Sequence, residues 1–383
     1  MRQKNPYRGN LIMLGWSALI GLAFIFGLAF GTSVKAADYK IEKIVTDLDS
    51  PWGLAILPQG DMLITQLSGK LRLIRNGKLV NEPVRGVPES YYASQGGLMD
   101  IVLHPDYADN QLVYLSLAVG TPDANALRVI RGRFNGTALE DVQTVFEATP
   151  TKDTPAHYGG RMAFLADKSL LITVGDGFDY REQAQNLNNH FGTIVRVTDS
   201  GKVPADNPFV GRDEVQPEIW SYGHRNAQSI IYDKQTGYVW QTEHGPRGGD
   251  ELNLIEAGKN YGWPIATFGL DYSGARVSPY SAYKGTIQPL VYWTPSIAPS
   301  GMTLYRGTQF PQWDGDIFIT SLVFNNVVRV DMADGQVVRR EVLFPEIAER
   351  IRDIRTGRDG ALYILSEGKD DEGGKLWRVS ANR

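Results

Sequence analysis

One of the five histidines, His157, has neighbours that could support proton transfer. His157 is followed by Gly159–Gly160 in the stretch TPAHYGGRMAF, residues 154–164. Because glycine has no Cβ, this pair lets a flat ligand approach the backbone closely. Asp176 lies in a Gly-Asp-Gly turn directly after the strand expected over 167–175, which predicts that it comes near His157. A carboxylate on one imidazole nitrogen fixes the tautomer and raises the basicity of the other, as a general base requires.

Other interpretations of these residues stay open at this stage. His157 could be a surface residue in a turn, and Asp176 and Asp179 could form turns or bind calcium. The other four histidines are expected in structural roles: His224 and His244 in hydrogen bonds, and His104 and His190 in turns.

The segment SYGHRNAQS, residues 221–229, has a similar design. Arg225 offers a planar fork for a carboxylate or carbonyl oxygen, and Asn226 offers both a donor and an acceptor. Both stand in a loop ahead of an expected strand, among glycine and aromatic residues. They are therefore predicted to contact a ligand.

A possible calcium site follows in TEHGPRGGDELNLIEAGKNYGWP, residues 242–264. Calcium prefers hard oxygen ligands from carbonyl and carboxylate groups. The segment supplies both kinds: the carbonyls of Gly245 and Pro246, and the carboxylates of Asp250, Glu251 and Glu256.

Three arginines occur in RIRDIRTG, residues 350–357. Strand alternation places Arg350 and Arg352 on one face. Like charges on one face repel each other unless an anion lies between them. The pair therefore predicts an anionic ligand with more than one carboxylate.

The elements that must position these residues are short strands. A turn followed by an apolar strand recurs six times, and most copies have a second strand before or a third strand after. The six copies occur at 59–65, 109–116, 167–175, 235–243, 314–321 and 359–366. No linker-like stretch interrupts 40–380. We predict an all-β, six-bladed β-propeller over 37–383, with the functional loops around one end of its channel.

The N-terminus has the pattern of an export signal. Three basic residues precede an uncharged apolar run at 11–30, and small residues follow at 36 and 37. Residues 1–36 are predicted to be a signal peptide or an N-terminal membrane anchor, with the remainder exported to the periplasm or an equivalent compartment. Beyond residue 36, 35 basic and 43 acidic residues give a net charge of −8, which disfavours nucleic acid as a partner. The chain has no cysteine, which excludes disulfides and thiolate sites.

Taken as an ordered set, these loops resemble the glucose/sorbosone dehydrogenase family, which includes soluble aldose sugar dehydrogenases that use pyrroloquinoline quinone (PQQ). The resemblance covers nearly all of 40–380 and rests on several motifs: QGGLMDIVLHPDY, HYGGR, VGDG, GHRN, EHGP..GDELNLI..G.NYGWP and RIRD. It implies a six-bladed propeller that holds PQQ over the channel mouth and a calcium ion that bridges PQQ to the protein.

The resemblance also implies roles for individual positions. His157 matches the base that takes the proton of the anomeric hydroxyl, and Asp176 matches the acid that orients it. Arg225 matches a contact to the quinone oxygen that gains charge. Further cofactor contacts are implied for Gln95, Asn226, Tyr272, Arg350 and Arg352. The carbonyls of Gly245 and Pro246 match ligands of the cofactor's calcium, and a second calcium site is implied at Glu251 and the Tyr261 carbonyl, with Asp271 as a further candidate.

One position departs from the family pattern. The aldose sugar dehydrogenases that this chain resembles carry a lysine on the fifth blade that pairs with PQQ, whereas TSLVFNNVVRV, residues 320–330, has none. Val323 is the best match to that lysine. A lost charge-assisted contact costs about 1.5–3 kcal/mol, unless Asn325 or Asn326 compensates in part.

The expected function is PQQ- and calcium-dependent oxidation of an aldose to its lactone, with electrons passed to an external acceptor. Two alternatives predict different chemistry. A calcium-dependent propeller lactonase would use His157 to activate water, and a non-catalytic envelope propeller would bind glycans or proteins. The arginine pair favours the first hypothesis, because neither alternative needs a site for several carboxylates.

Overall fold

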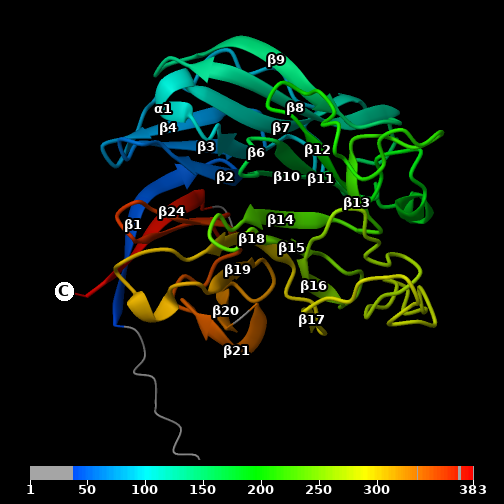
Figure 1. The fold of residues 1–383 in the computed structure, drawn as a ribbon. Helices are drawn as coiled ribbons and strands as arrows, with labels where there is room; N and C mark the ends of the chain where they lie inside the picture. Colours follow the sequence, from blue (N-terminus) through cyan, green and yellow to red (C-terminus); the bar gives the residue numbers. More distant parts are fainter. Residues whose placement is uncertain (1–37, 334, 370–371, 383) are drawn as a thin grey trace, which may run out of the picture. The chain divides into compact units, whose positions relative to one another are not determined.

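The computed structural model describes residues 38–333, 335–369 and 372–382, and the expected leader over 1–36 lies outside them. The described chain forms six four-stranded antiparallel sheets, which are arranged as blades around a common axis (Figure 1). The predicted six-bladed propeller is confirmed. Within 38–382, apart from the gaps at 334 and 370–371, no helix is both long enough and apolar enough to cross a membrane.

Each of the first three blades uses four consecutive strands. The first contains β2 (Pro51–Ile56), β3 (Met62–Gln66), β4 (Leu71–Arg75) and β5 (Lys78–Leu79). The second contains β6 (Leu98–Leu103), β7 (Leu112–Thr121), β8 (Ala124–Phe134) and β9 (Leu139–Glu147). The third contains β10 (Gly159–Phe164), β11 (Leu170–Val174), β12 (Thr193–Val197) and β13 (Ile219–Tyr222).

The remaining blades complete the ring. The fourth contains β14 (Ala227–Tyr232), β15 (Val239–Glu243), β16 (Asp250–Leu254) and β17 (Val291–Trp293). The fifth contains β18 (Pro299–Leu304), β19 (Ile317–Ser321), β20 (Val327–Ala333) and β21 (Gln336–Leu343). The sixth contains β22 (Ile351–Thr356), β23 (Leu362–Ser366), β24 (Gly374–Ala381) and, at its outer edge, β1 (Tyr39–Leu48).

The two ends of the described chain close the ring together. Strand β1 pairs antiparallel with β24, with Tyr39 opposite Ala381, so the blue and red strands lie side by side in Figure 1. This pairing places the first described strand in the last blade, and the chain then continues into β2 of the first blade.

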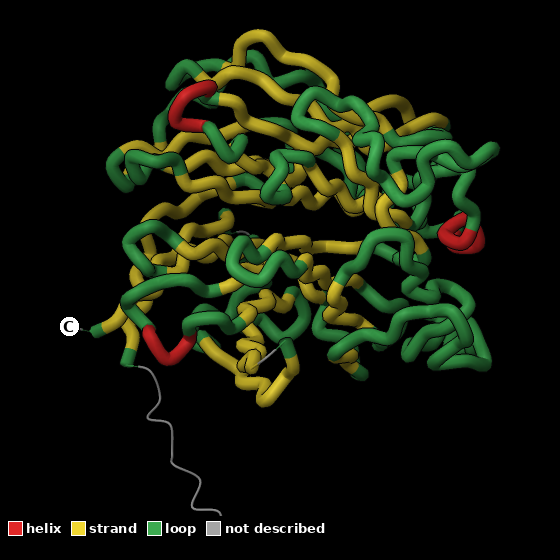
Figure 2. The backbone as a smooth tube through the Cα atoms, in the orientation of Figure 1, coloured by secondary structure: helices red, strands yellow, loops and turns green. Residues whose placement is uncertain are grey.

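The outermost strands were not predicted from the sequence, and their exposure explains why. In β21 most side chains of QVVRREVL are exposed or half-buried, whereas all five residues of β3 and β11 are buried. An outer strand packs on one neighbour only, so it needs no continuous apolar run. The long connections after β12 and β16 have almost no regular structure and appear as loops in Figure 2.

A buried arginine ties the blades together at the axis. The Arg161 guanidinium lies within 3.1 Å of an Asp100 oxygen and 3.3 Å of an Asp353 oxygen, and it packs 3.9 Å from the centre of the Trp52 ring. It also donates to three backbone carbonyls, those of Gln228, Ser300 and Arg352. A buried cation needs such compensation. These partners come from the innermost strands of the other five blades, so Arg161 links all six blades to one another.

Candidate active site

The structure brings His157 and Asp176 into direct contact. Nδ1 of His157 lies 2.7 Å from Oδ1 of Asp176, and both side chains are buried. His157 stands two residues before β10, and Asp176 stands two residues after β11, so pairing of these strands joins the two loops. Gly175 makes the approach possible, because a Cβ there would lie 2.2 Å from the His157 carbonyl oxygen.

The surroundings of Asp176 determine the tautomer of His157. Asp176 also accepts hydrogen bonds from the Phe178 amide at 2.9 Å and from the Trp263 indole at 2.8 Å. A carboxylate that accepts three donors leaves the shared proton on Nδ1 of His157. Nε2 of His157 then carries the free lone pair. The backbone of His157 is held as well, because its amide donates to the Gln95 side chain at 2.9 Å.

Burial makes the neutral form of His157 the favoured one. It lowers the pKa of His157 below its ordinary value of 6.5, and the charges of Arg225 and Lys152 act in the same direction, against the opposing effect of Asp176. At neutral pH the imidazole is therefore uncharged and able to accept a proton.

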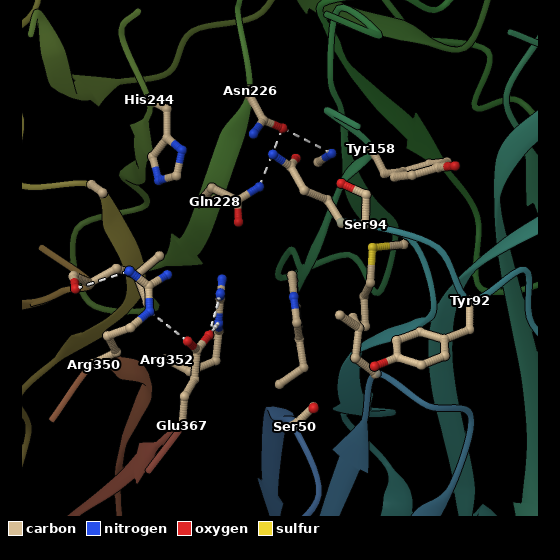
Figure 3. Close-up of a pocket in the computed structure, with 17 residues that line it drawn as sticks. Ser50, Tyr92, Ser94, Tyr158, Asn226, Gln228, His244, Arg350, Arg352 and Glu367 are labelled. Atoms are coloured by element: carbon tan, nitrogen blue, oxygen red, sulfur yellow. Dashed lines mark hydrogen bonds and ion pairs between the residues drawn. The ribbon is translucent and has the colours of Figure 1, made fainter. Parts of the chain in front are cut away.

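A cavity of about 580 Å³ lies beside this pair. Four of the residues predicted to contact the cofactor line it: Gln95, Asn226, Arg350 and Arg352. Figure 3 shows Asn226, Gln228 and His244 on one side of the open centre and the arginine pair on another, with Tyr92 and Tyr158 opposite. The wall thus combines amide and guanidinium donors with aromatic surfaces.

The arginine pair differs from the expectation in one respect. Glu367, which was not predicted, lies between the two guanidinium groups: its Oε2 is 2.7 Å from Nε of Arg350, and its Oε1 is 2.8 Å from Nε of Arg352 (Figure 3). The anion required between like charges is therefore supplied by the chain itself. No sequence motif marked Glu367, because it reaches Arg350 and Arg352 from the end of a different strand, β23.

Arg225 and Tyr272 line a second cavity, of about 310 Å³, and not the first. The Arg225 guanidinium donates to the Gly245 carbonyl at 2.7 Å and lies 3.5 Å from the Tyr272 hydroxyl. The Tyr272 ring also stacks with Phe178, which forms a T-shaped contact with His157 at 5.0 Å between ring centres. Tyr272 therefore lies on the second cavity, whereas Asn226, which follows Arg225 in the chain, lines the larger one.

The predicted calcium ligands are distributed over two places. Pro246 lines the second cavity beside Arg225. Glu251, Tyr261 and Gly245 line a small cavity of about 10 Å³, together with Glu243, which was not predicted. That volume accommodates one water-sized particle. Burial and the charge of Glu243 raise the pKa of Glu251 well above its ordinary range.

Three other acidic residues take no part in this small cavity. Asp250 accepts hydrogen bonds from the amides of Gly245, Ile297 and Ala298 and from Ser296, which makes it a loop anchor. Glu256 is exposed. Asp271 pairs with Arg181 at 3.2 Å on the second cavity. The described part of the chain contains no cluster of three or more His, Cys, Asp or Glu side chains that could hold a metal ion.

The remaining histidines are buried and hydrogen-bonded. His224 contacts Ser221 at 2.9 Å and Glu243 at 3.2 Å, and Nε2 of His244 donates to the Pro299 carbonyl at 2.7 Å. Burial lowers the pKa of His244 to about 3, and His244 also lines the larger cavity. His104 and His190, which were expected in turns, lie in loops next to turns or bends, and both are buried.

Lys152 is a further residue that sequence reasoning missed. Its ammonium donates to Asn125 at 3.0 Å and to the Thr154 carbonyl, and lies 3.6 Å from the centre of the Tyr158 ring. Burial lowers its pKa to about 7.

Val323, the position matched to the family lysine, has an exposed apolar side chain. It follows Leu322, which lines the larger cavity.

Comparison with known proteins assigns this chain to a protein family. A family model described as glucose/sorbosone dehydrogenase matches residues 48–378. The chain belongs to the glucose/sorbosone dehydrogenase family. One relative in this family is the aldose sugar dehydrogenase YliI of Escherichia coli, which is 40% identical over 350 residues, or 90% of this chain and 93% of that protein.

Solved structures of similar proteins share the same propeller. The soluble aldose sugar dehydrogenase (Asd) from Escherichia coli in its apo-form has a TM-score of 0.86 at 40% identity, covering 90% of this chain and 100% of that one. The PQQ-bound form of an aldose sugar dehydrogenase from Streptomyces coelicolor has a TM-score of 0.74 at 26% identity, covering 90% and 99%.

Proposed function

We propose that this member of the glucose/sorbosone dehydrogenase family oxidises aldose sugars at the anomeric carbon to lactones, with PQQ and Ca²⁺ as cofactors. An external acceptor takes the electrons. The names of the relatives support a sugar oxidoreductase, and the PQQ-bound structure of one of them supports the cofactor. The observation that carries the proposal is the buried pair of His157 and Asp176 beside a cavity lined by two arginines.

The chemistry of the larger cavity fits PQQ. Its volume of about 580 Å³ lies within the range of cofactor sites. PQQ is flat and carries three carboxylates, so it requires cations and amide donors along its edge. Arg350 and Arg352 provide the cations, and Gln95, Asn226 and Gln228 provide amide groups.

The oxygen ligands of the fourth blade fit calcium. Glu243 and Glu251 are carboxylates that line one small cavity together with Tyr261 and Gly245. Two carboxylates at one enclosed cavity repel each other unless a cation or a proton intervenes. Glu251 and the Tyr261 carbonyl would hold a structural calcium there, and the carbonyls of Gly245 and Pro246 would hold the calcium of the cofactor.

The residues of the chain have separate tasks in the proposed reaction. PQQ would supply an electrophilic quinone that takes the hydride, which is the anomeric hydrogen together with two electrons. Ca²⁺ would supply the charge that polarises the quinone. Nε2 of His157 accepts the proton of the anomeric hydroxyl. Asp176 holds the ring in the required tautomer and stabilises the imidazolium that results. Arg225, which lines the second cavity, would supply a positive charge toward the cofactor from that side.

Reconstitution tests this proposal directly. Purified apo-protein is incubated with PQQ and Ca²⁺, and reduction of an artificial electron acceptor is followed with a panel of aldoses. We expect turnover with wild-type protein and none with His157→Ala, which should still bind PQQ because His157 does not line the larger cavity. A fully active His157→Ala variant would refute its role as the base. Inactivity toward every aldose, combined with lactone hydrolysis in the absence of PQQ, would instead support the lactonase.

The proposed location is outside the cytoplasm. The basic residues before the apolar run at 11–30 favour export, with residues 1–36 as a signal peptide or an inner-membrane anchor. N-terminal sequencing of protein expressed with its full leader distinguishes the two, because only cleavage yields a chain that begins near residue 37.

A further inference from the structure

Glu367 occupies an unusual place in the larger cavity. Among the described residues that line this cavity it is the one carboxylate, and it contacts both arginines that line it. Its backbone amide also donates to the Arg350 carbonyl at 2.9 Å, which fixes the end of β23 against the start of β22. The pairing of β22 with β23 in the sixth blade therefore places the Glu367 carboxylate between the two arginines.

The electrostatics keep this carboxylate charged. Partial burial acts to raise the pKa of Glu367, but the charges and hydrogen bonds of Arg352 and Arg350 outweigh it and lower the pKa. In return, Glu367 relieves the repulsion between two guanidinium groups on one face. It uses the Nε groups of both arginines and also an Nη group of Arg352.

The same N–H groups are the natural donors for a carboxylate of a ligand. Arg350 is half exposed, with 51% of its side chain accessible, whereas Arg352 has 15% and Glu367 has 24%. A ligand carboxylate that enters from the cavity meets a guanidinium pair whose Nε–H groups already donate to Glu367. It must share them with Glu367 or replace it.

We propose that Glu367 is an exchangeable counter-ion, which neutralises Arg350 and Arg352 in the ligand-free protein and yields their N–H groups to the carboxylate of an anionic ligand. It thereby sets the affinity of the cavity for polycarboxylates. This inference rests on the proposed function in that PQQ is the expected ligand, but the exchange itself depends only on the ligand being a carboxylate.

A competing role predicts the opposite result. If Glu367 only orients the arginines toward the ligand, its removal disorders them and weakens binding. If Glu367 competes with the ligand, its neutralisation frees the donors and removes a repulsive charge, so binding becomes tighter. The direction of the change in affinity therefore separates the two roles.

The test uses direct binding and needs no turnover. PQQ is titrated into apo-protein with Ca²⁺ present, and quenching of tryptophan fluorescence is followed, since Trp52 lines the cavity. For Glu367→Gln we expect the Kd for PQQ to fall by about tenfold or more, because a charge-assisted contact is worth roughly that factor. Glu372→Gln is the matched control: it removes the same charge from the same blade at a side chain that is 69% exposed, outside the cavity, and should leave the Kd unchanged.

Thermal melting provides a second measurement on the same proteins. Without PQQ, Glu367→Gln should melt at a lower temperature than wild type, because its arginines have lost their counter-ion. PQQ should raise the Tm of Glu367→Gln by more than it raises the Tm of wild type. If Glu367→Gln does not fold, Glu367→Asp replaces it. The shorter carboxylate keeps the charge but reaches both arginines less well, so its Kd should lie below that of wild type. An unchanged or higher Kd in the folded variant overturns the proposal.

A second ligand separates this inference from the proposed function. Benzene-1,3,5-tricarboxylate is a flat triacid without a quinone. If the triacid binds more tightly to Glu367→Gln than to wild type while PQQ binds to neither, the counter-ion role stands and the cofactor assignment fails. If PQQ binds equally to both proteins, the cofactor assignment stands and the counter-ion role fails.

Discussion

Nδ1 of His157 and Oδ1 of Asp176 lie 2.7 Å apart in a buried contact, and the second oxygen of Asp176 is held by the Trp263 indole. This arrangement leaves Nε2 of His157 as the free base. For Asp176→Asn we expect kcat to fall by about 10²–10⁴-fold, because an amide can donate to Nδ1 and so favour the wrong tautomer. PQQ binding should persist, since Asp176 does not line the larger cavity. Steady-state kinetics and a PQQ titration measure both quantities.

The matched variant for that experiment is Trp263→Phe. It removes one hydrogen bond to Asp176 but keeps the carboxylate, so it should lose much less activity than Asp176→Asn. Equal activity of Asp176→Asn and wild type would show that Asp176 has no part in orienting His157.

The lowered pKa of His157 predicts how kcat/KM depends on pH at the acidic end. His157 must be neutral to accept a proton, so kcat/KM should fall as the pH decreases through its pKa, which burial places below 6.5. The groups that face His157 are Asp176, which raises this pKa, and Arg225 and Lys152, which lower it. Lys152→Met should therefore move the acidic limb to higher pH. A limb centred above pH 6.5 in wild-type protein would contradict the prediction.

The pair of Glu243 and Glu251 predicts a calcium-dependent stability. Calcium that binds only the folded protein stabilises it by about 2.7 kcal/mol at one hundred times its Kd. Wild-type protein should therefore melt at a higher temperature in Ca²⁺ than in a chelator. In Glu251→Gln this difference should shrink or vanish. Glu256→Gln is the control, because Glu256 is exposed, and it should behave as wild type. A wild-type melting temperature that does not respond to Ca²⁺ would remove this site.

A lysine introduced at position 323 should increase the affinity for PQQ. Val323 is 53% exposed beside the cavity residue Leu322, at the position that we propose corresponds to a PQQ-pairing lysine of the family. In Val323→Lys a new charge-assisted contact should lower the Kd for PQQ by about tenfold. Val338→Lys adds the same charge at a valine that is 64% exposed on the outer strand β21, and it should have no effect. Equal Kd values for Val323→Lys and wild type would argue against this match.

Strand periodicity and turn residues were sufficient to predict the propeller. Inner strands such as β3 and β11 are buried throughout, so their apolar runs are visible in the sequence. The contact of His157 with Asp176 also followed from the sequence, because the two residues flank paired strands of one blade. Outer strands such as β21 were missed, since half-exposed residues leave no distinctive pattern.

Contacts between blades could not be predicted in this way. Arg161 lies in a recognisable motif, yet its place at the axis depends on Asp100 and Asp353, which are 61 and 192 residues away. Glu367 lies between two arginines because β22 and β23 pair. Tyr272, in the long connection between β16 and β17, lines the second cavity. Sequence patterns report neighbours along a strand, and they therefore predicted the blades and the catalytic candidates. The counter-ions, the contacts of Arg161 at the axis and the division into two cavities arise from segments far apart in the chain, and their positions depend on how all six blades pack.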